Sequence, residues 1–127
     1  MKTKNITICG KEITVAYCFM TEAIYKEVTG EDYSVLGQEI ADCIKGKNDP
    51  DMSKLFALIY AAELAYYEKD EPFTIKDLMR KSTFDEVTAA IVTIVGLRAA
   101  FFHIPAGEPA DTVPSDSPAG TEDGSKN

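Results

Sequence analysis

Residues 5–18 have the sequence NITICGKEITVAYC, in which apolar and polar side chains alternate on both sides of Gly10 and Lys11. Alternation with a period of two is typical of strands, and glycine at the first of two central residues is typical of a type II′ turn. We therefore expect a β-hairpin in which Ile8 lies opposite Ile13. One face of this hairpin is apolar and is expected to point toward the core; it comprises Ile6, Ile8, Ile13, Val15 and Tyr17.

Beyond this hairpin the period of the apolar residues changes from two to about 3.6, which predicts helices. The expected helices cover about residues 21–30, 34–44, 51–69, 74–81 and 83–103. Capping boxes mark the last two starts, with Thr74 paired to Asp77 and Thr83 paired to Glu86. The sequence therefore predicts a mostly α fold with a short N-terminal β-hairpin (α+β), with about five helices in a small orthogonal bundle.

The chain has 127 residues, which is enough for one domain, and its composition changes near residue 104. Residues 105–127 hold four of the six prolines, no aromatic residue, and five acids against Lys126. Such a segment buries too little apolar surface to offset its ordering entropy. We expect one domain at 1–104, a hairpin plus helices, followed by a disordered acidic tail or linker at 105–127.

The charge balance argues against a nucleic-acid partner. Lys and Arg number 13 and Asp and Glu number 21, which gives a net charge of −8, opposite to what a phosphate backbone attracts. The stretch 87–104 has a single formal charge, that of Arg98, but a span needs about 20 apolar residues, so we expect no membrane helix. The N-terminus alternates and does not run apolar, so we expect no signal peptide and a cytoplasmic location.

Residues able to do chemistry are few. The three cysteines, Cys9, Cys18 and Cys43, form no CxxC pair and no even disulfide set, so we expect reduced thiols and no metal. The single histidine, His103, falls in the last turn of a predicted helix, where an imidazolium stabilises the negative end of the helix dipole. No catalytic motif is present, so we expect neither an enzyme nor a cofactor.

Apolar residues are more numerous on the third predicted helix than one neighbouring element can cover. A core stripe comprises Leu55, Leu58, Ile59, Ala62 and Tyr66. A second strip, about 100° away around the helix axis, comprises Phe56, Tyr60 and Tyr67 and is interrupted by Glu63. Either this helix is buried between two neighbours, or its second strip binds a partner protein.

The last predicted helix has the same excess. Its broad apolar stripe comprises Phe84, Val87, Ile91, Ile94, Val95, Phe101 and Phe102. Its small residues Ala89, Gly96 and Ala100 are expected to let another backbone come close, and Arg98 is expected to pair with a carboxylate or to reach the domain edge. The candidate partner-binding residues are Phe56, Tyr60, Tyr67, Leu64, Phe101 and Phe102.

The order of these parts is similar to that of a known family. A hairpin, ITICGKEITVAY, precedes the segment VTGEDYSVL, the helix DMSKLFALIYAAEL, an acidic turn with EPFT, and a final capped helix. Over residues 6 to about 100 this order resembles the tail assembly chaperones of long-tailed bacteriophages and prophages, in particular the small, mostly helical type. Thr29-Gly30-Glu31-Asp32, with Leu36 after it, carries most of the likeness.

The resemblance implies a function and a set of partners. It implies binding of the tape measure protein, a very long helical chain that is kept soluble until tail tube subunits polymerise around it. It further implies contact with the tail tube protein, self-association, and a longer form made by a ribosomal frameshift. The final Ser125-Lys126-Asn127 can be encoded by codons that contain a slippery heptamer.

Two other functions explain the same apolar strips. A helical adaptor or regulator would bind another host or mobile-element protein, and a virion tail or head connector would remain in the mature particle. Gene neighbourhood distinguishes the chaperone from the adaptor, and presence in mature particles distinguishes the connector.

Overall fold

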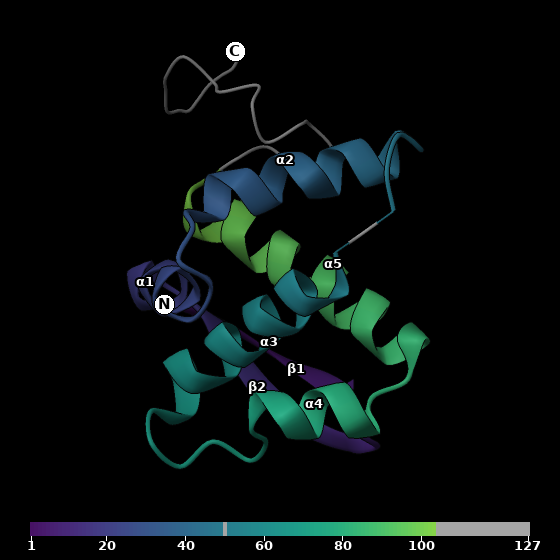
Figure 1. Cartoon of the computed structure of the whole chain (residues 1–127). Coiled ribbons are helices and arrows are strands. Elements are labelled where there is room, and N and C mark those ends of the chain that lie inside the picture. The colour runs from purple at the N-terminus through teal and green to yellow at the C-terminus, as the bar shows by residue number, and fades with distance from the viewer. Residues whose placement is uncertain (50, 104–127) are drawn as a thin grey trace.

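The computed structural model describes residues 1–49 and 51–103, which form two strands followed by five helices (Figure 1). The elements are β1 (Lys2–Ile8), β2 (Lys11–Tyr17), α1 (Phe19–Thr29), α2 (Tyr33–Ile44), α3 (Met52–Tyr67), α4 (Ile75–Lys81) and α5 (Phe84–Phe101). This confirms the predicted fold class, mostly α with an N-terminal hairpin. The predicted disorder of 105–127 concerns residues outside the described part of the chain.

The hairpin turn lies one residue earlier than predicted. Cys9 and Gly10 occupy the two central positions with φ values of 53° and 74°, and Ile8 pairs with Lys11. Positive φ at both positions is typical of a type I′ turn, not of the expected type II′. The predicted pairing of Ile8 with Ile13 is therefore wrong, since Ile13 lies opposite Ile6.

The predicted apolar face is nevertheless correct. Moving a turn by one residue moves each partner by two positions, which leaves every side chain on the same face. The relative exposed area of the five predicted residues, Ile6, Ile8, Ile13, Val15 and Tyr17, is at most 6%. These five side chains form the sheet side of the hydrophobic core, which is called the floor below.

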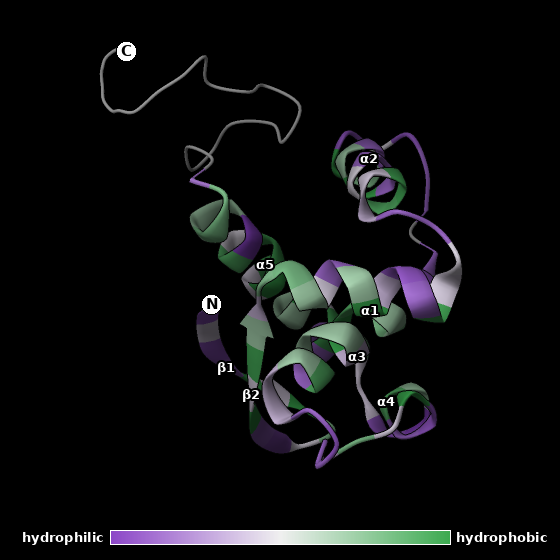
Figure 2. Ribbon diagram, turned by 90° about the vertical axis from the view of Figure 1, so that its left-hand side faces the viewer, coloured by the Kyte–Doolittle hydropathy of each residue, from purple (hydrophilic) through white to green (hydrophobic). Residues whose placement is uncertain are grey.

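Two helices cover this floor. α3 packs over β2 and α5 packs over β1, and these two helices also contact each other. α1 and α4 pack against α3, while α2 lies at one end of the molecule and enters the core through Tyr33 and Leu36 (Figures 1 and 2). The core therefore lies between the apolar face of the hairpin and the two helices α3 and α5.

Some predicted faces of α3 and α5 are wrong. Tyr66 is 43% exposed, because it lies in the last turn of α3 beside the Tyr67 ring and not over the sheet. Phe84, the first residue of α5, is 65% exposed. The predicted small-residue contact is also absent from the described part of the chain: a Cβ added to Gly96 would meet nothing within 4 Å, and Ala100 is exposed. α5 packs on the sheet through its large apolar residues, which leaves the small ones outside.

The capping predictions for the last two helices are confirmed. Thr74 and Asp77 form a reciprocal capping box at α4, and Thr83 and Glu86 form another at α5. Each box satisfies backbone N–H groups that would lack a partner at a helix start. The two helix starts were therefore encoded locally.

Candidate functional site: an aromatic patch where α1 meets α5

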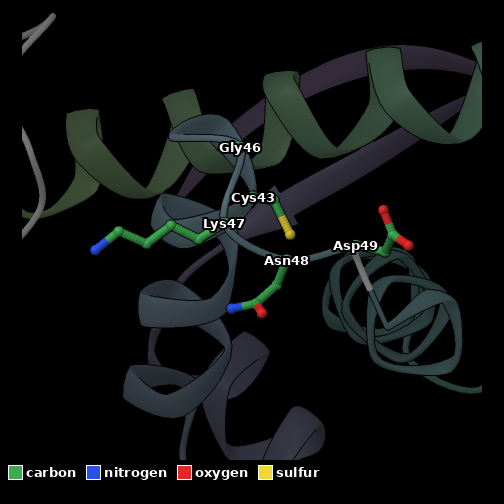
Figure 3. A pocket seen from close by; sticks show the side chains of 5 residues that line it. All are labelled: Cys43, Gly46, Lys47, Asn48 and Asp49. Atoms are coloured by element: carbon green, nitrogen blue, oxygen red, sulfur yellow. The ribbon is translucent and has the colours of Figure 1, made fainter.

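The depressions of the described surface lack the geometry of an active site. One is open and lies in the loop between α2 and α3, lined by Cys43, Gly46, Lys47, Asn48 and Asp49. Figure 3 shows its side chains pointing in different directions, with the Lys47 amine directed away from the Asp49 carboxylate. No nucleophile and base converge there.

A second depression lies between α1, α3 and α4, and its central charge is already paired. Lys54 Nζ lies 3.0 Å from Glu31 Oε2 and also binds Glu39. These hydrogen bonds, that with Glu39 foremost, raise the pKa of Lys54, so the amine stays charged. A charged lysine held by two carboxylates is unsuited to act as a base or nucleophile.

Glu63 is fully buried on α3, where it was expected only to interrupt a surface strip. Its Oε1 accepts a hydrogen bond from the Phe73 amide at 3.2 Å, while Oε2 has no partner among the residues that the structure describes. Burial raises the pKa of Glu63 to about 8, with further contributions from the charges of Glu71 and Asp77. The carboxyl lines neither depression described above, so its protonation bears on stability.

Aromatic side chains gather on the surface where α1 begins and α5 ends. The ring centroids of Phe19 and Phe101 lie 5.1 Å apart, those of Phe101 and Phe102 5.0 Å, and those of Phe19 and Phe102 6.1 Å. All three pairs meet edge to face, the arrangement that aromatic quadrupoles favour. Phe19 is 73% exposed and Phe102 is 37% exposed. We call these three residues the aromatic patch.

The connection from β2 to α1 places Phe19 at the surface. α1 begins two residues earlier than predicted, with Cys18 as its N-cap, so Thr21 lies inside the first turn of the helix. The buried Thr21 hydroxyl accepts a hydrogen bond from the Cys18 amide at 3.1 Å and donates one to the Ala16 carbonyl at 3.0 Å. This side chain closes the turn between the two elements, and the first residue of the helix is left pointing outward.

An ion pair lies directly beneath the patch. Arg98 Nε donates to Glu22 Oε2 at 3.0 Å, and the Tyr17 hydroxyl donates to the same oxygen. The Arg98 guanidinium carbon lies 4.5 Å from the centre of the Tyr33 ring and 4.9 Å from that of Phe102. The prediction that Arg98 pairs with a carboxylate is confirmed, and cation–π contact with Phe102 ties the pair to the patch.

The side chains beneath the aromatic patch keep fixed protonation states near neutral pH. Burial is the largest single influence and disfavours the charge on Arg98, but the hydrogen bond to Glu22 and the charge interactions with Tyr17, Tyr33 and Glu22 together outweigh it and raise the pKa of the guanidinium. Burial likewise raises the pKa of Tyr17 and of Tyr33, so both remain neutral phenols. Arg98, Tyr17 and Tyr33 therefore do not exchange protons near neutral pH, which makes these three side chains unsuited to acid–base chemistry.

The structure divides the six predicted partner-binding residues into two groups. Phe101 and Phe102 belong to the aromatic patch. The other four lie on α3, half-buried against the core: Phe56, Tyr60, Leu64 and Tyr67. Of the two expectations for the second strip of α3, the structure favours a helix packed between neighbours, since these four side chains are half-buried against the core.

The two tyrosines of α3 have structural partners. The Tyr60 hydroxyl donates to Glu71 Oε2 at 3.0 Å. The Tyr67 hydroxyl accepts from the Thr14 amide of β2 at 3.1 Å. Both rings therefore hold α3 to its surroundings.

Sequence reasoning missed Phe19, Tyr33 and Glu22. The predicted start of the first helix at residue 21 excluded Phe19 from any helix face. Glu22 and Arg98 are 76 residues apart in the chain, so no local pattern relates them. Only an earlier start for the first helix, after Cys18, would have drawn attention to the exposed phenylalanine.

Comparison of the chain with protein-family models, with curated proteins and with solved structures finds no match. Among the described helices, none combines the length and the apolar content that crossing a membrane requires. The three cysteines are free thiols.

Proposed function

We propose that this chain is a tail assembly chaperone of a long-tailed phage or prophage, which binds the tape measure protein in the bacterial cytoplasm. The exposed aromatic patch is the observation that supports it: Phe19, Phe101 and Phe102 offer an apolar surface at one end of an acidic molecule. Aromatic residues are enriched in the cores of protein interfaces. The resemblance of the sequence to this family supplies the identity of the client.

The patch has the rigidity that a binding surface needs. Its rings contact one another, and the Arg98 guanidinium, paired with Glu22, packs against the Phe102 ring. A rigid apolar surface loses little side-chain entropy on binding. An apolar stripe on an amphipathic client helix is the partner that such a surface covers.

The charge of the chain suits a protein that keeps another in solution. A net charge of −8 disperses a complex by mutual repulsion. Many copies along one long client would add avidity, so each patch needs only modest affinity. The net negative charge and a modest affinity of each patch suit a chaperone that must leave the client when the tube assembles.

The test is co-expression with the tape measure protein encoded in the same gene cluster. We expect the client to be soluble with the wild-type chain and to precipitate with the double variant Phe19→Ser, Phe102→Ser. The matched control is Phe84→Ser, since Phe84 is 65% exposed but lies at the other end of α5. Circular dichroism and thermal unfolding verify that all variants are folded.

The outcomes separate the competing functions. Equal client solubility with the patch variant and the control would refute the assignment of the patch. Failure of the wild-type chain to bind the tape measure protein would refute the chaperone function, and capture of a different protein would favour an adaptor. Recovery of the chain from mature particles would favour a connector.

A further inference from the structure

Within the described residues the sheet has two strands, and its two edges differ. In the pairing of Ile8 with Lys11 across a two-residue turn, Thr14 and Ala16 direct their backbone groups away from β1. Thr14 N donates to the Tyr67 hydroxyl, and the Ala16 carbonyl accepts from the Thr21 hydroxyl. The outer edge of β2 is therefore covered by α3 and α1.

The outer edge of β1 is open. The same ladder directs the backbone N–H and C=O groups of Thr3, Asn5 and Thr7 away from β2. Within residues 1–49 and 51–103, no group hydrogen-bonds to them. An open edge of this kind is a template for another strand.

We propose that β1 pairs with β1 of a second copy, which joins the two hairpins into a four-stranded antiparallel sheet across a two-fold axis. The strand has seven residues, and its central residue, Asn5, has outward backbone groups. The register that pairs all seven residues therefore places hydrogen-bonding positions opposite one another: Asn5 faces its own copy and Thr3 faces Thr7.

The side chains suit this register. Lys2 lies opposite Ile8 of the other copy, and Lys4 lies opposite Ile6, so no like charges meet. A different register, in which Lys4 lay opposite Lys4 of the other copy, would place two positive charges opposite each other. The full register also brings Lys2 of one copy beside the hairpin turn of the other, where Glu86 binds the Cys9 and Gly10 amides.

The flank of α5 beside this edge is free of charge along most of its length. Glu86 reaches the hairpin turn on one side of α5, whereas Arg98 reaches α1 on the other. Residues spaced three or four positions apart lie on the same side of a helix. The side of α5 that carries Glu86 therefore also carries Ala89, Thr93, Gly96 and Ala100. Ala89, Gly96 and Ala100 are exposed.

This flank is suited to an antiparallel contact with its own copy. Steps of three and four are the spacing along which two helices pair, and small side chains let their backbones approach closely. Thr93 lies midway between Glu86 and Ala100, as Asn5 lies midway along β1. In the proposed dimer one two-fold axis passes Asn5 of β1 and Thr93 of α5 and relates both pairs of elements. The aromatic patch lies on the α1 side and stays free, so this dimer is independent of the proposed function.

The first test is the mass of the full chain in solution by light scattering and sedimentation. We expect twice the 13.9 kDa of one chain. Ala89→Arg should weaken the dimer by roughly tenfold or more, because it buries an unpaired charge in the seam. The control Ala23→Arg places the same side chain at an exposed position of α1 and should leave the dimer unchanged.

The second test addresses the strand pair. Thr7→Pro removes an outward N–H without touching the bonds to β2 and should abolish the dimer, whereas Thr7→Val should preserve it. Asn5→Cys should form a disulfide with its own copy on oxidation, since paired Cα atoms lie about 5.5 Å apart. Glu12→Cys, on β2, should not do so. The proposal is overturned if the wild-type chain has the mass of one copy, if Ala89→Arg stays fully dimeric, or if Asn5→Cys fails to cross-link.

Discussion

Glu63 has an unusual environment at the scale of one residue. Its carboxyl is fully buried, and one oxygen has no partner. An isolated buried carboxylate is costly, and the protonated form is preferred. The residue therefore makes the stability of the fold sensitive to pH in a range where most acids are fully ionised.

We predict that stability falls as the pH rises through this range. Above about pH 4.5 the unfolded chain releases the Glu63 proton, whereas the folded chain keeps it up to about pH 8. The free energy of unfolding should therefore decrease by roughly 1.4 kcal/mol per pH unit across this window. Urea unfolding at several pH values measures the slope.

The variant Glu63→Gln should remove most of this slope, because the amide does not titrate. The control Glu27→Gln changes an exposed acid on α1 and should keep the slope. A wild-type slope unchanged in Glu63→Gln would show that another group is responsible.

Two helical glycines give a second prediction at this scale. Gly96 lies in the interior of α5 with open space at its Cβ position within one chain, so in the Ala89→Arg background, where the proposed dimer is weakened, Gly96→Ala should stabilise the fold by about 1 kcal/mol. At Gly37 of α2 a new Cβ would lie 3.2 Å from Tyr33 Cε2, so Gly37→Ala should gain less. Thermal unfolding at one protein concentration compares them. Equal gains would contradict the expected crowding at Gly37.

At the scale of elements, Glu86 connects a helix start to a strand turn. Its Oε1 accepts from the Thr83 amide at 3.0 Å and the Cys9 amide at 3.1 Å, and its Oε2 accepts from the Gly10 amide at 3.0 Å. These backbone hydrogen bonds, that from Thr83 foremost, lower the pKa of Glu86. One carboxylate thus caps α5 and holds the positive φ values of the hairpin turn.

Comparison with Asp77 tests this double role. Asp77 occupies the same position in the capping box of α4, but its side chain accepts only from Thr74. We predict that Glu86→Ala lowers the urea midpoint more than Asp77→Ala, because it also leaves two turn amides without partners. Hydrogen exchange at Cys9 and Gly10 should accelerate in Glu86→Ala alone. Similar losses in both variants would mean that the turn does not depend on Glu86.

At the scale of the whole molecule, α5 relates the two proposed surfaces. Phe101 and Phe102 lie at its C-terminal end, while its small-residue flank belongs to the proposed dimer contact beside β1, on which α5 packs. A two-fold axis through that flank would direct two aromatic patches toward opposite ends of the dimer. Two patches on one body would bind a long client with avidity if their spacing matches its repeats.

Local patterns determined most of the fold. The alternation in the hairpin, both capping boxes and the change of period after Cys18 predicted the element types and the apolar face of the sheet. These signals are local because strand alternation and helix capping involve residues within about four positions of one another.

Contacts between distant residues decided the rest. The turn shifted by one residue because Glu86, far along the chain, binds the amides of Cys9 and Gly10. The second strip of α3 is half-buried because several elements surround that helix, and the exposed patch depends on Phe19 meeting Phe101. Sequence periodicity shows that a helix has two apolar faces, but which face is covered depends on how many neighbours pack on it, and only the tertiary structure supplies that number.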